Sequence, residues 1–389
     1  MTMLANSEIV RLTDFRHDLH RHPELSGEEE RTARAVVDLL TQTRPDQVLA
    51  GLGGHGVAIV YDSGRPGPTV MFRAELDALP IEELTDVPHR SVVPGKGHLC
   101  GHDGHTTILA GLGMVLARTR PARGRAVLMF QPAEEDGSGA AAVIADPRFA
   151  GIRPDWAFAI HNMPGIPLGA IGIGAGPANC ASMGMRIVLD GRTAHASMPE
   201  TGISPASCVA EVISALPALA PGGAMTDDFR LASLCHVHIG RSAFGVVPGR
   251  AEMWITLRSV TDAGLQELGR VFRTDVERRA AGHGLRVSFE VDDLFHACTN
   301  DDEACETMLR AAEALNMQQA AVSLPMRGSE DFGLFGHHAR SAMALLGSGE
   351  DLPQLHNPDY DFPDALIQPG VRLFARLAAD ILGEEPTRL

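Results

Sequence analysis

The chain begins with two stretches in which apolar residues recur at the spacing of one helix face. The first stripe consists of Ile9, Leu12, Phe15 and Leu19. A helix over this stripe would be capped by Asn6 or Ser7 and would end before Pro23. The segment Ser26–Glu29 resembles a capping box, which predicts a second helix through residues 36–40. Three histidines fall at the polar end of the first helix: His17, His20 and His22. We expect these side chains to be solvated or locally hydrogen-bonded, although they could also line a site.

Four short apolar runs bounded by glycine, proline or polar residues predict strands of a covered sheet. They are Val57–Val60, Thr69–Phe72, Ala126–Phe130 and Trp156–Ile160. The last three runs end directly in polar segments, namely Arg73–Asp77, Gln131–Asp136 and His161–Asn162. In α/β sheets the functional site lies outside the carboxyl ends of the strands. We therefore expect these three strand ends to converge on one site.

From about residue 179 the order of the expected elements changes to strand, helix, strand, strand, helix, strand. The runs are Met183–Leu189, Pro205–Leu216, Leu231–Ile239, Ala251–Leu257, Leu265–Ala280 and Leu285–Val291. This order describes a ferredoxin-like unit. We predict an α/β catalytic domain over residues 1–178 and 296–389, with the ferredoxin-like α+β domain inserted over residues 179–295.

Length and charge support this division and exclude some partners. A chain of 389 residues is long for one core, which favours two domains. The formal net charge of −16 argues against nucleic acid or an anionic membrane as partner. The chain shows no secretory leader and no long apolar span, and its six cysteines have no regular spacing. These features predict a cytoplasmic protein with reduced thiols.

The stretch Leu99–His105 places a thiol, two imidazoles and a carboxylate in seven positions, separated by two glycines. Cysteine and histidine are ligands for Zn²⁺ and similar cations, and Cys100 and His102 can face one point if the chain is not helical there. A polar loop with chance histidines is the alternative. The loop is therefore half of a metal site only if further ligands come from elsewhere in the chain.

Seven motifs occur in a fixed order along the chain. They are Arg21–Leu25, Ala74–Pro80, Cys100–Thr106, Gln131–Glu135, His161–Asn162, Gly328–Phe332 and His356–Pro358. In these motifs the chain resembles the metallo-amidohydrolase family of hippurate hydrolases, N-acyl-amino-acid amidohydrolases and auxin-conjugate hydrolases. That family belongs to the wider aminoacylase and carboxypeptidase superfamily of two-domain zinc exopeptidases. The resemblance implies that the inserted domain serves as a lid or dimerisation domain.

The resemblance also implies a binuclear centre of two divalent ions, which could be Zn, Mn, Co or Ni. Its ligands would be Cys100, His102, Glu135, His161 and His356. Glu134 would be the general base for a metal-activated water, because adjacent residues on an extended chain point to different sides. A solvated acidic turn is the alternative for Glu134 and Glu135. Asp77 resembles the residue that orients a ligand histidine, and Asp103 and His105 are expected to support the loop.

Two further site residues are expected on the inserted domain. By the resemblance, His195 would donate to the developing oxyanion and contact substrate, and its counterpart can reach the active site of the partner subunit in a dimer. Arg258 would bind a substrate carboxylate. Gly245 departs from the family, which commonly has asparagine there, so the leaving amine is open.

The function implied is hydrolysis of the amide bond of a small N-acyl amino acid or conjugate, by a homodimer that pairs through the inserted domain. A dipeptidase or carboxypeptidase of the same fold is the alternative. A non-catalytic ligand-binding relative is a third reading, and it would be expected to lack Glu134.

Overall fold

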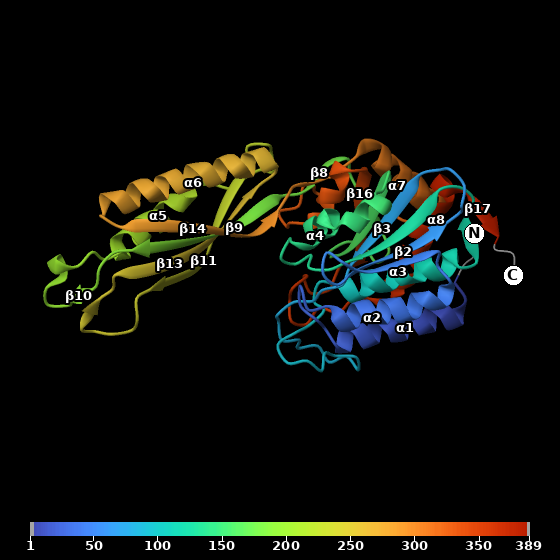
Figure 1. Ribbon diagram of the computed structural model, residues 1–389, viewed down its shortest axis with the longest axis horizontal. Coiled ribbons are helices and arrows are strands. Elements are labelled where there is room, and N and C mark those ends of the chain that lie inside the picture. Colours follow the sequence, from blue (N-terminus) through green and yellow to red (C-terminus); the bar gives the residue numbers. More distant parts are fainter. Residues whose placement is uncertain (1–3, 387–389) are drawn as a thin grey trace. The chain divides into compact units, whose positions relative to one another are not determined.

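A computed structural model describes residues 4–386, which fold into two compact units (Figure 1). The first unit contains the described residues up to Ala178, Thr299–Ser323, and those from Asp331 onward. The second contains Asn179–Cys298 and also Leu324–Glu330. The sequence placed this last segment in the catalytic domain, which is wrong. It joins the second unit because the Cys180 N–H donates to Met326 O at 3.1 Å and Arg258 donates to Arg327 O at 3.0 Å.

The first unit is built on a seven-stranded mixed sheet that includes all four predicted strands. In spatial order the strands are β1 (Gln47–Leu52), β2 (Gly56–Asp62), β5 (Arg125–Gln131), β3 (Thr69–Glu75), β6 (Trp156–Pro164), β16 (Arg340–Gly349) and β7 (Ile171–Gly172). Strand β3 pairs in parallel with β5 and with β6, and β16 pairs in parallel with β6. The carboxyl ends of these parallel strands therefore lie along one edge of the sheet, as the sequence predicted.

Helices cover this sheet, with α1 and α2 packed outside α3 (Figure 1). The helices of the unit are α1 (Asn6–Arg21), α2 (Glu30–Leu40), α3 (His102–Leu116), α4 (Gly139–Ala145), α7 (Asp302–Ala314) and α8 (Ile367–Leu382). The first two begin differently from the prediction. The cap of α1 is Ala5, whose N–H donates to Glu8. Near the start of α2 the Glu24 carboxylate accepts from Arg31 N–H and Thr32 N–H, in place of a capping box at residues 26–29.

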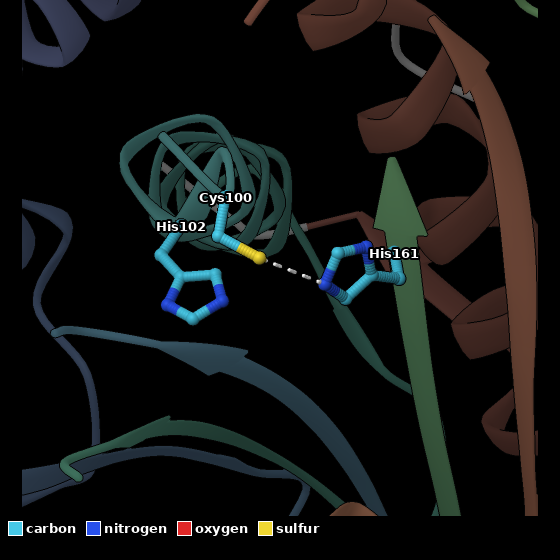
Figure 2. Close-up of side chains that lie close together, drawn as sticks. All are labelled: Cys100, His102 and His161. Atoms are coloured by element: carbon cyan, nitrogen blue, oxygen red, sulfur yellow. Dashed lines mark hydrogen bonds between the residues drawn. The ribbon is translucent and has the colours of Figure 1, made fainter. Parts of the chain in front are cut away.

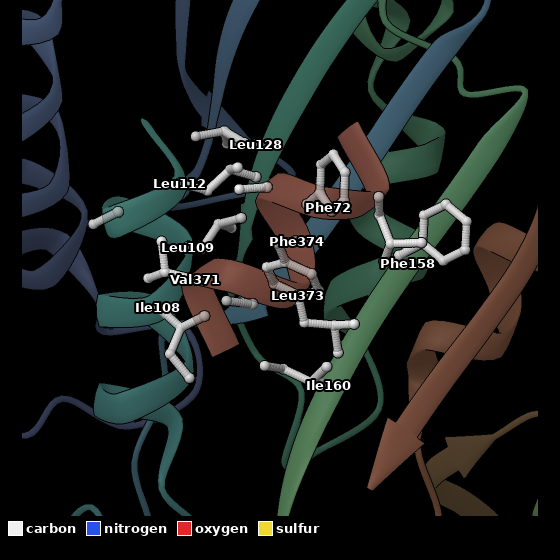
Figure 3. Packing of buried hydrophobic residues seen from close by; sticks show 14 of the residues in the cluster. Phe72, Ile108, Leu109, Leu112, Leu128, Phe158, Ile160, Val371, Leu373 and Phe374 are labelled. Atoms are coloured by element: carbon white, nitrogen blue, oxygen red, sulfur yellow. The ribbon is translucent and has the colours of Figure 1, made fainter. Parts of the chain in front are cut away.

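Helix α3 is buried along its whole length, in contact with the sheet, with α8 and with α1. Figure 3 shows the apolar side chains that meet there: Ile108, Leu109 and Leu112 of α3, Val371, Leu373 and Phe374 of α8, and Phe72, Leu128, Phe158 and Ile160 of the sheet. Each such side chain contributes roughly 1.5–3 kcal/mol when fully buried. A Cβ at Gly111 would lie 2.4 Å from Val371 Cγ2, so this glycine permits the close approach of α3 and α8. The core thus fixes the helix whose first turn carries His102.

The second unit has the predicted βαββαβ order. Its elements are β9 (Ala181–Asp190), α5 (Ala206–Leu219), β11 (Arg230–Ile239), β13 (Arg250–Ser259), α6 (Asp262–Gly282) and β14 (Arg286–Phe295). The four strands form an antiparallel sheet in the order β11-β13-β9-β14, which confirms the ferredoxin-like topology. A separate ribbon pairs β10 (Ala194–His195) with β12 (Val246–Val247).

The remaining short elements are strands and 3₁₀ helices. They are β4 (Thr119–Pro121), β8 (Gly176–Asn179), β15 (Cys298–Asn300), β17 (Glu384–Pro386), η1 (Thr41–Thr43), η2 (Pro147–Gly151), η3 (Pro199–Thr201), η4 (Asp331–His337) and η5 (Asp364–Leu366). Within residues 4–386, no helix has both the length and the apolar character needed to cross a bilayer.

Candidate metal centre

The candidate ligands of the first unit come from four segments of the chain that meet at one edge of the sheet. Cys100 immediately precedes α3, and His102 is the first residue of that helix. The turn that carries Glu134 and Glu135 follows β5, while His161 lies on β6. The His356 N–H donates to Leu99 O at 2.8 Å, which ties the His356 loop to the Cys100 loop.

The bend between Cys100 and His102 depends on a glycine. Gly101 has φ +89°, and a Cβ there would lie 1.9 Å from Asn162 Oδ1. Only glycine fits at this position, because residues with a side chain disfavour positive φ and because no space remains for a Cβ atom. The bend turns the Cys100 thiol toward β6, where Sγ lies 3.6 Å from His161 Nε2 (Figure 2).

Hydrogen bonds determine which ring nitrogen of each histidine faces this point. Nδ1 of His161 donates to Asn162 O at 2.8 Å, and Nδ1 of His102 donates to Asp77 O at 3.0 Å. A carbonyl oxygen only accepts, so in each ring Nδ1 carries a proton. Nε2 of His102 is buried and has no hydrogen-bond partner among residues 4–386. Histidine metal ligands are held in this way, with the second nitrogen donating to a carbonyl or carboxylate.

Glu134 and Glu135 lie in a turn, not on extended chain, which corrects the argument that placed their side chains on opposite sides of a strand. Strand β5 ends at Gln131, and residues 134–137 form the turn. Glu134 is only 6% exposed, so the alternative that its side chain is solvated is wrong. Glu134 Oε2 and Glu135 Oε1 lie 3.9 and 3.8 Å from His102 Nε2. Glu135 Oε2 lies 3.6 Å from His356 Nε2.

Three overlapping sets of side chains have donor atoms within 4.8 Å of one another. They are Cys100, His102 and His161; Cys100, Glu135 and His356; and His102, Glu134 and Glu135. Cys100 belongs to two sets, so one sulfur is near both groups of donors. Thiolate, imidazole and carboxylate are the ligands that suit Zn²⁺ and neighbouring transition-metal ions. The donor set and the unpartnered nitrogen of His102 therefore fit a pair of divalent ions.

Without ions, the electrostatics of the centre differ from one donor to the next: burial opposes a charge on His102, but the neighbouring Cys100 and Asp77 raise its pKa well above its usual range. Burial and the nearby Glu135 carboxylate raise the pKa of the Cys100 thiol well above its usual range. Burial and the neighbouring His105 lower the pKa of His161 to about 3, which leaves its Nε2 lone pair available.

His105 supports this centre because both of its nitrogens are occupied. Its Nε2 accepts the Asn162 N–H at 3.0 Å, and its Nδ1 donates to Glu75 Oε2 at 2.7 Å. Glu75 is in turn paired with the buried Arg73, which also donates to Asp331 at 2.7 Å. The chain thus fixes the ends of β3 and β6 beside the candidate ligands.

A buried ion network next to the centre was missed by the sequence interpretation, which expected His20 to be solvated or locally hydrogen-bonded, with the lining of a site as the alternative. His20 is fully buried, with Nδ1 at 2.9 Å from Asp103 Oδ2 and Nε2 at 3.2 Å from Glu83 Oε1. Arg16, one turn earlier on α1, donates to Asp103 and to Asp361, each at 2.9 Å. In the sequence, this network is indicated only by the i, i+4 spacing of Arg16 and His20 on one helix face. Their acidic partners Asp103 and Asp361 are distant in the sequence.

This network predicts a specific dependence of stability on pH. Burial opposes the charge on His20, but Asp103 and Glu83 raise its pKa to about 9. Because the pKa of His20 is higher in the folded protein than the value near 6.5 in the unfolded protein, its protonation stabilises the fold fully below pH 6.5. This stabilisation is lost as the pH rises toward 9. In denaturant titrations of the chelator-treated protein, the free energy of unfolding should fall by about 3 kcal/mol over this interval. His20→Gln should flatten the fall, whereas His22→Gln should not; an equal fall in His20→Gln would contradict the assignment.

The remaining predicted residues lie in the second unit. His195 is exposed on the β10–β12 ribbon opposite Val246, and its Nδ1 lies 2.7 Å from Ser197 Oγ. The Arg258 guanidinium donates to Ser329 Oγ at 2.7 Å. Gly245 accepts the Ala196 N–H through its carbonyl, and a Cβ there would meet nothing within 4 Å. No steric reason therefore explains why this chain has glycine where the family commonly has asparagine.

Comparison with known proteins identifies similar chains over almost the whole length. Residues 71–380 match the family described as Peptidase family M20/M25/M40. The chain is 30% identical over 375 residues to N-acetylcysteine deacetylase of Bacillus subtilis (strain 168), covering 96% of this chain and 97% of that protein. It is 29% identical to hippurate hydrolase of Campylobacter jejuni, covering 95% and 96%. A Bacillus subtilis structure described as a dinuclear metal binding peptidase from the M20 family has a TM-score of 0.80 and 28% identity, covering 97% of this chain and 99% of that one.

Proposed function

The chain belongs to peptidase family M20/M25/M40, and from this premise we propose that it hydrolyses the amide bond of N-acylated amino acids or similar small conjugates. The resemblance seen in the sequence motifs is confirmed by this membership. The protein is a hydrolase of amide bonds in a family that includes dinuclear metal-binding members. What remains a proposal is the substrate, the identity of the ions and the role of each residue.

The observation that carries the proposal is the convergence of two overlapping donor sets around Cys100. We assign five ligands to the pair of ions: Cys100, His102, Glu135, His161 and His356. Bound divalent ions supply positive charge that polarises a scissile carbonyl and lowers the pKa of a coordinated water. Nδ1 of His102 remains protonated on Asp77 O, so only Nε2 is available to an ion.

Glu134 is the general base of the proposed reaction. Its carboxylate is nearly buried beside His102 and lies on the same turn as the ligand Glu135. At this position it takes the proton from the attacking water and later delivers that proton to the leaving nitrogen. The proposal keeps His195 as donor to the developing oxyanion and Arg258 as partner for a substrate carboxylate, because of their sequence motifs.

N-acyl amino acids are favoured over peptides by the names of the two relatives similar at about 30% identity, a deacetylase and a hippurate hydrolase. A dipeptidase or carboxypeptidase remains the alternative, since the similar solved structure is described as a peptidase. A non-catalytic binding protein is disfavoured because Glu134, which such a relative does not need, is present and nearly buried.

Removal and return of metal test the proposed reaction. Chelator-treated protein should lose hydrolysis of acetyl- and benzoyl-amino acids, and Zn²⁺, Mn²⁺, Co²⁺ or Ni²⁺ should each be added back to identify the ion that restores it. A panel of dipeptides at the same metal concentration provides the comparison. Faster hydrolysis of dipeptides than of acyl amino acids would favour the alternative, and activity that survives chelation with no metal bound would refute the metal-dependent mechanism.

The proposal includes a homodimer formed through the inserted domain. Strand β11 is an edge strand of the antiparallel sheet, and an edge of this kind can pair across a two-fold axis. Light scattering coupled to size-exclusion chromatography would measure the mass directly. A cytoplasmic location also belongs to the proposal and stays a prediction.

A further inference from the structure

The turn that presents Glu134 and Glu135 begins at a residue with an unfavourable backbone conformation. Ala133 has φ +49°, in the left-handed region that non-glycine residues rarely adopt. For an alanine this conformation is disfavoured, because its Cβ crowds the following carbonyl oxygen. Such a conformation persists only where surrounding contacts determine it. The contacts of Ala133 therefore decide how the two following carboxylates are presented.

The Ala133 peptide is held on both of its polar groups. Its N–H donates to Glu29 Oε1 at 2.8 Å, and its carbonyl accepts the Gly139 N–H at 2.9 Å. Glu29 is fully buried and reaches Ala133 from 104 positions earlier in the chain. The same Oε1 accepts the Gly27 N–H at 2.9 Å, which fixes the carboxylate within its own loop.

A second contact from the same part of the chain holds the other side of Glu134. The Glu135 N–H donates to Asp77 Oδ2 at 2.9 Å, and that oxygen also accepts the Ser26 hydroxyl at 2.8 Å. The peptide that precedes Ala133 and the peptide that follows Glu134 are therefore both anchored to residues that the loop Ser26–Glu29 supplies or contacts.

We propose that Glu29 is a positioning residue for the reaction, which holds Ala133 in its left-handed conformation and thereby separates the base Glu134 from the ligand Glu135. This inference rests on the proposed function of that turn. The contacts described above join Glu29 Oε1 to the backbone N–H groups of Ala133 and Gly27, so it acts on the turn through the backbone. Its role requires a hydrogen-bond acceptor at Oε1 and does not require a negative charge.

The requirement for an acceptor makes a conservative variant informative. Glu29→Gln keeps an oxygen that accepts from Ala133 and Gly27, whereas Glu29→Ala removes it. A displacement of catalytic groups by about 1 Å can lower a rate about 100-fold. We expect Glu29→Ala to lower kcat by about this factor with KM little changed. We expect the kcat of Glu29→Gln to stay near that of the unsubstituted protein.

Glu24 offers a matched control on the same loop. Its carboxylate also accepts two backbone N–H groups, but those belong to Arg31 and Thr32 at the start of α2. Glu24→Ala should lower the melting temperature while kcat of the metal-loaded protein stays unchanged. An equal loss of kcat in Glu24→Ala and Glu29→Ala would overturn the inference, since the effect would then be general loosening of the loop.

Hydrogen exchange supplies a readout that does not depend on catalysis. In chelator-treated protein, the amides of residues 131–137 should exchange faster in Glu29→Ala than in Glu29→Gln or Glu24→Ala. Unchanged exchange in Glu29→Ala, or equal losses of kcat in both Glu29 variants, would overturn the positioning role. If the unsubstituted protein hydrolyses no amide substrate with any ion, the proposed function fails, and the exchange experiment still decides whether Glu29 holds the turn.

Discussion

Replacement of Glu134 by glutamine is expected to lower kcat by about two to four orders of magnitude while leaving two ions bound per chain. Glutamine has nearly the same shape but cannot accept a proton at neutral pH. The geometry makes the loss selective, because Glu135 and not Glu134 lies next to both His102 and His356. Kinetics on an acetyl-amino acid and metal analysis of the same preparation would measure the two effects together.

The neighbouring acidic residue of the turn provides the control for this variant. Asp136 accepts the Ser138 N–H and belongs to none of the three sets of donors described above. Asp136→Asn should retain both activity and metal. Substantial turnover by Glu134→Gln would show that another group is the base, and a loss of metal would show that Glu134 is itself a ligand.

Replacement of Cys100 by alanine should remove at least one ion per chain and abolish activity. Its sulfur belongs to both the set with His102 and His161 and the set with Glu135 and His356, so its loss removes a donor from both sets. Metal stoichiometry after gel filtration would measure the loss.

A second buried cysteine of the same unit separates loss of metal from loss of packing. Cys305 lies on α7 within the apolar core and is as buried as Cys100. Cys305→Ala should lower stability by an amount typical of a small cavity and keep both ions. Unchanged metal content in Cys100→Ala would refute its assignment as a ligand.

Three of the five candidate ligands could be located from the sequence because they lie at the end of a strongly patterned element. Cys100 and His102 precede a helix with a continuous apolar pattern, and His161 continues a buried strand. The rule that parallel strands present their carboxyl ends at one edge then brings these residues together. The family resemblance supplied Glu135 and His356, which no local pattern distinguishes from other acidic or histidine residues.

The supporting contacts could not be predicted in the same way. The sequence interpretation expected His20 to be solvated or locally hydrogen-bonded, yet its side chain is buried and bonded to Asp103, which lies 83 positions away. It placed Glu134 and Glu135 on extended chain, yet Ala133 turns the backbone into the left-handed region. It also assigned Leu324–Glu330 to the catalytic domain, because single hydrogen bonds such as those from Cys180 N–H to Met326 O and from Arg258 to Arg327 O are not visible as a periodic pattern.

By itself the sequence determined the helices and strands, the inserted ferredoxin-like unit and the set of candidate ligands. These depend on the periodicity of apolar side chains and on the order of short motifs, which are local properties of the chain. Only the tertiary structure decided which nitrogen of each histidine is available, which carboxylate of the turn faces which histidine, and what holds Ala133. Those features depend on single hydrogen bonds between residues such as Glu29 and Ala133, 104 positions apart, and folding alone brings such atoms within reach.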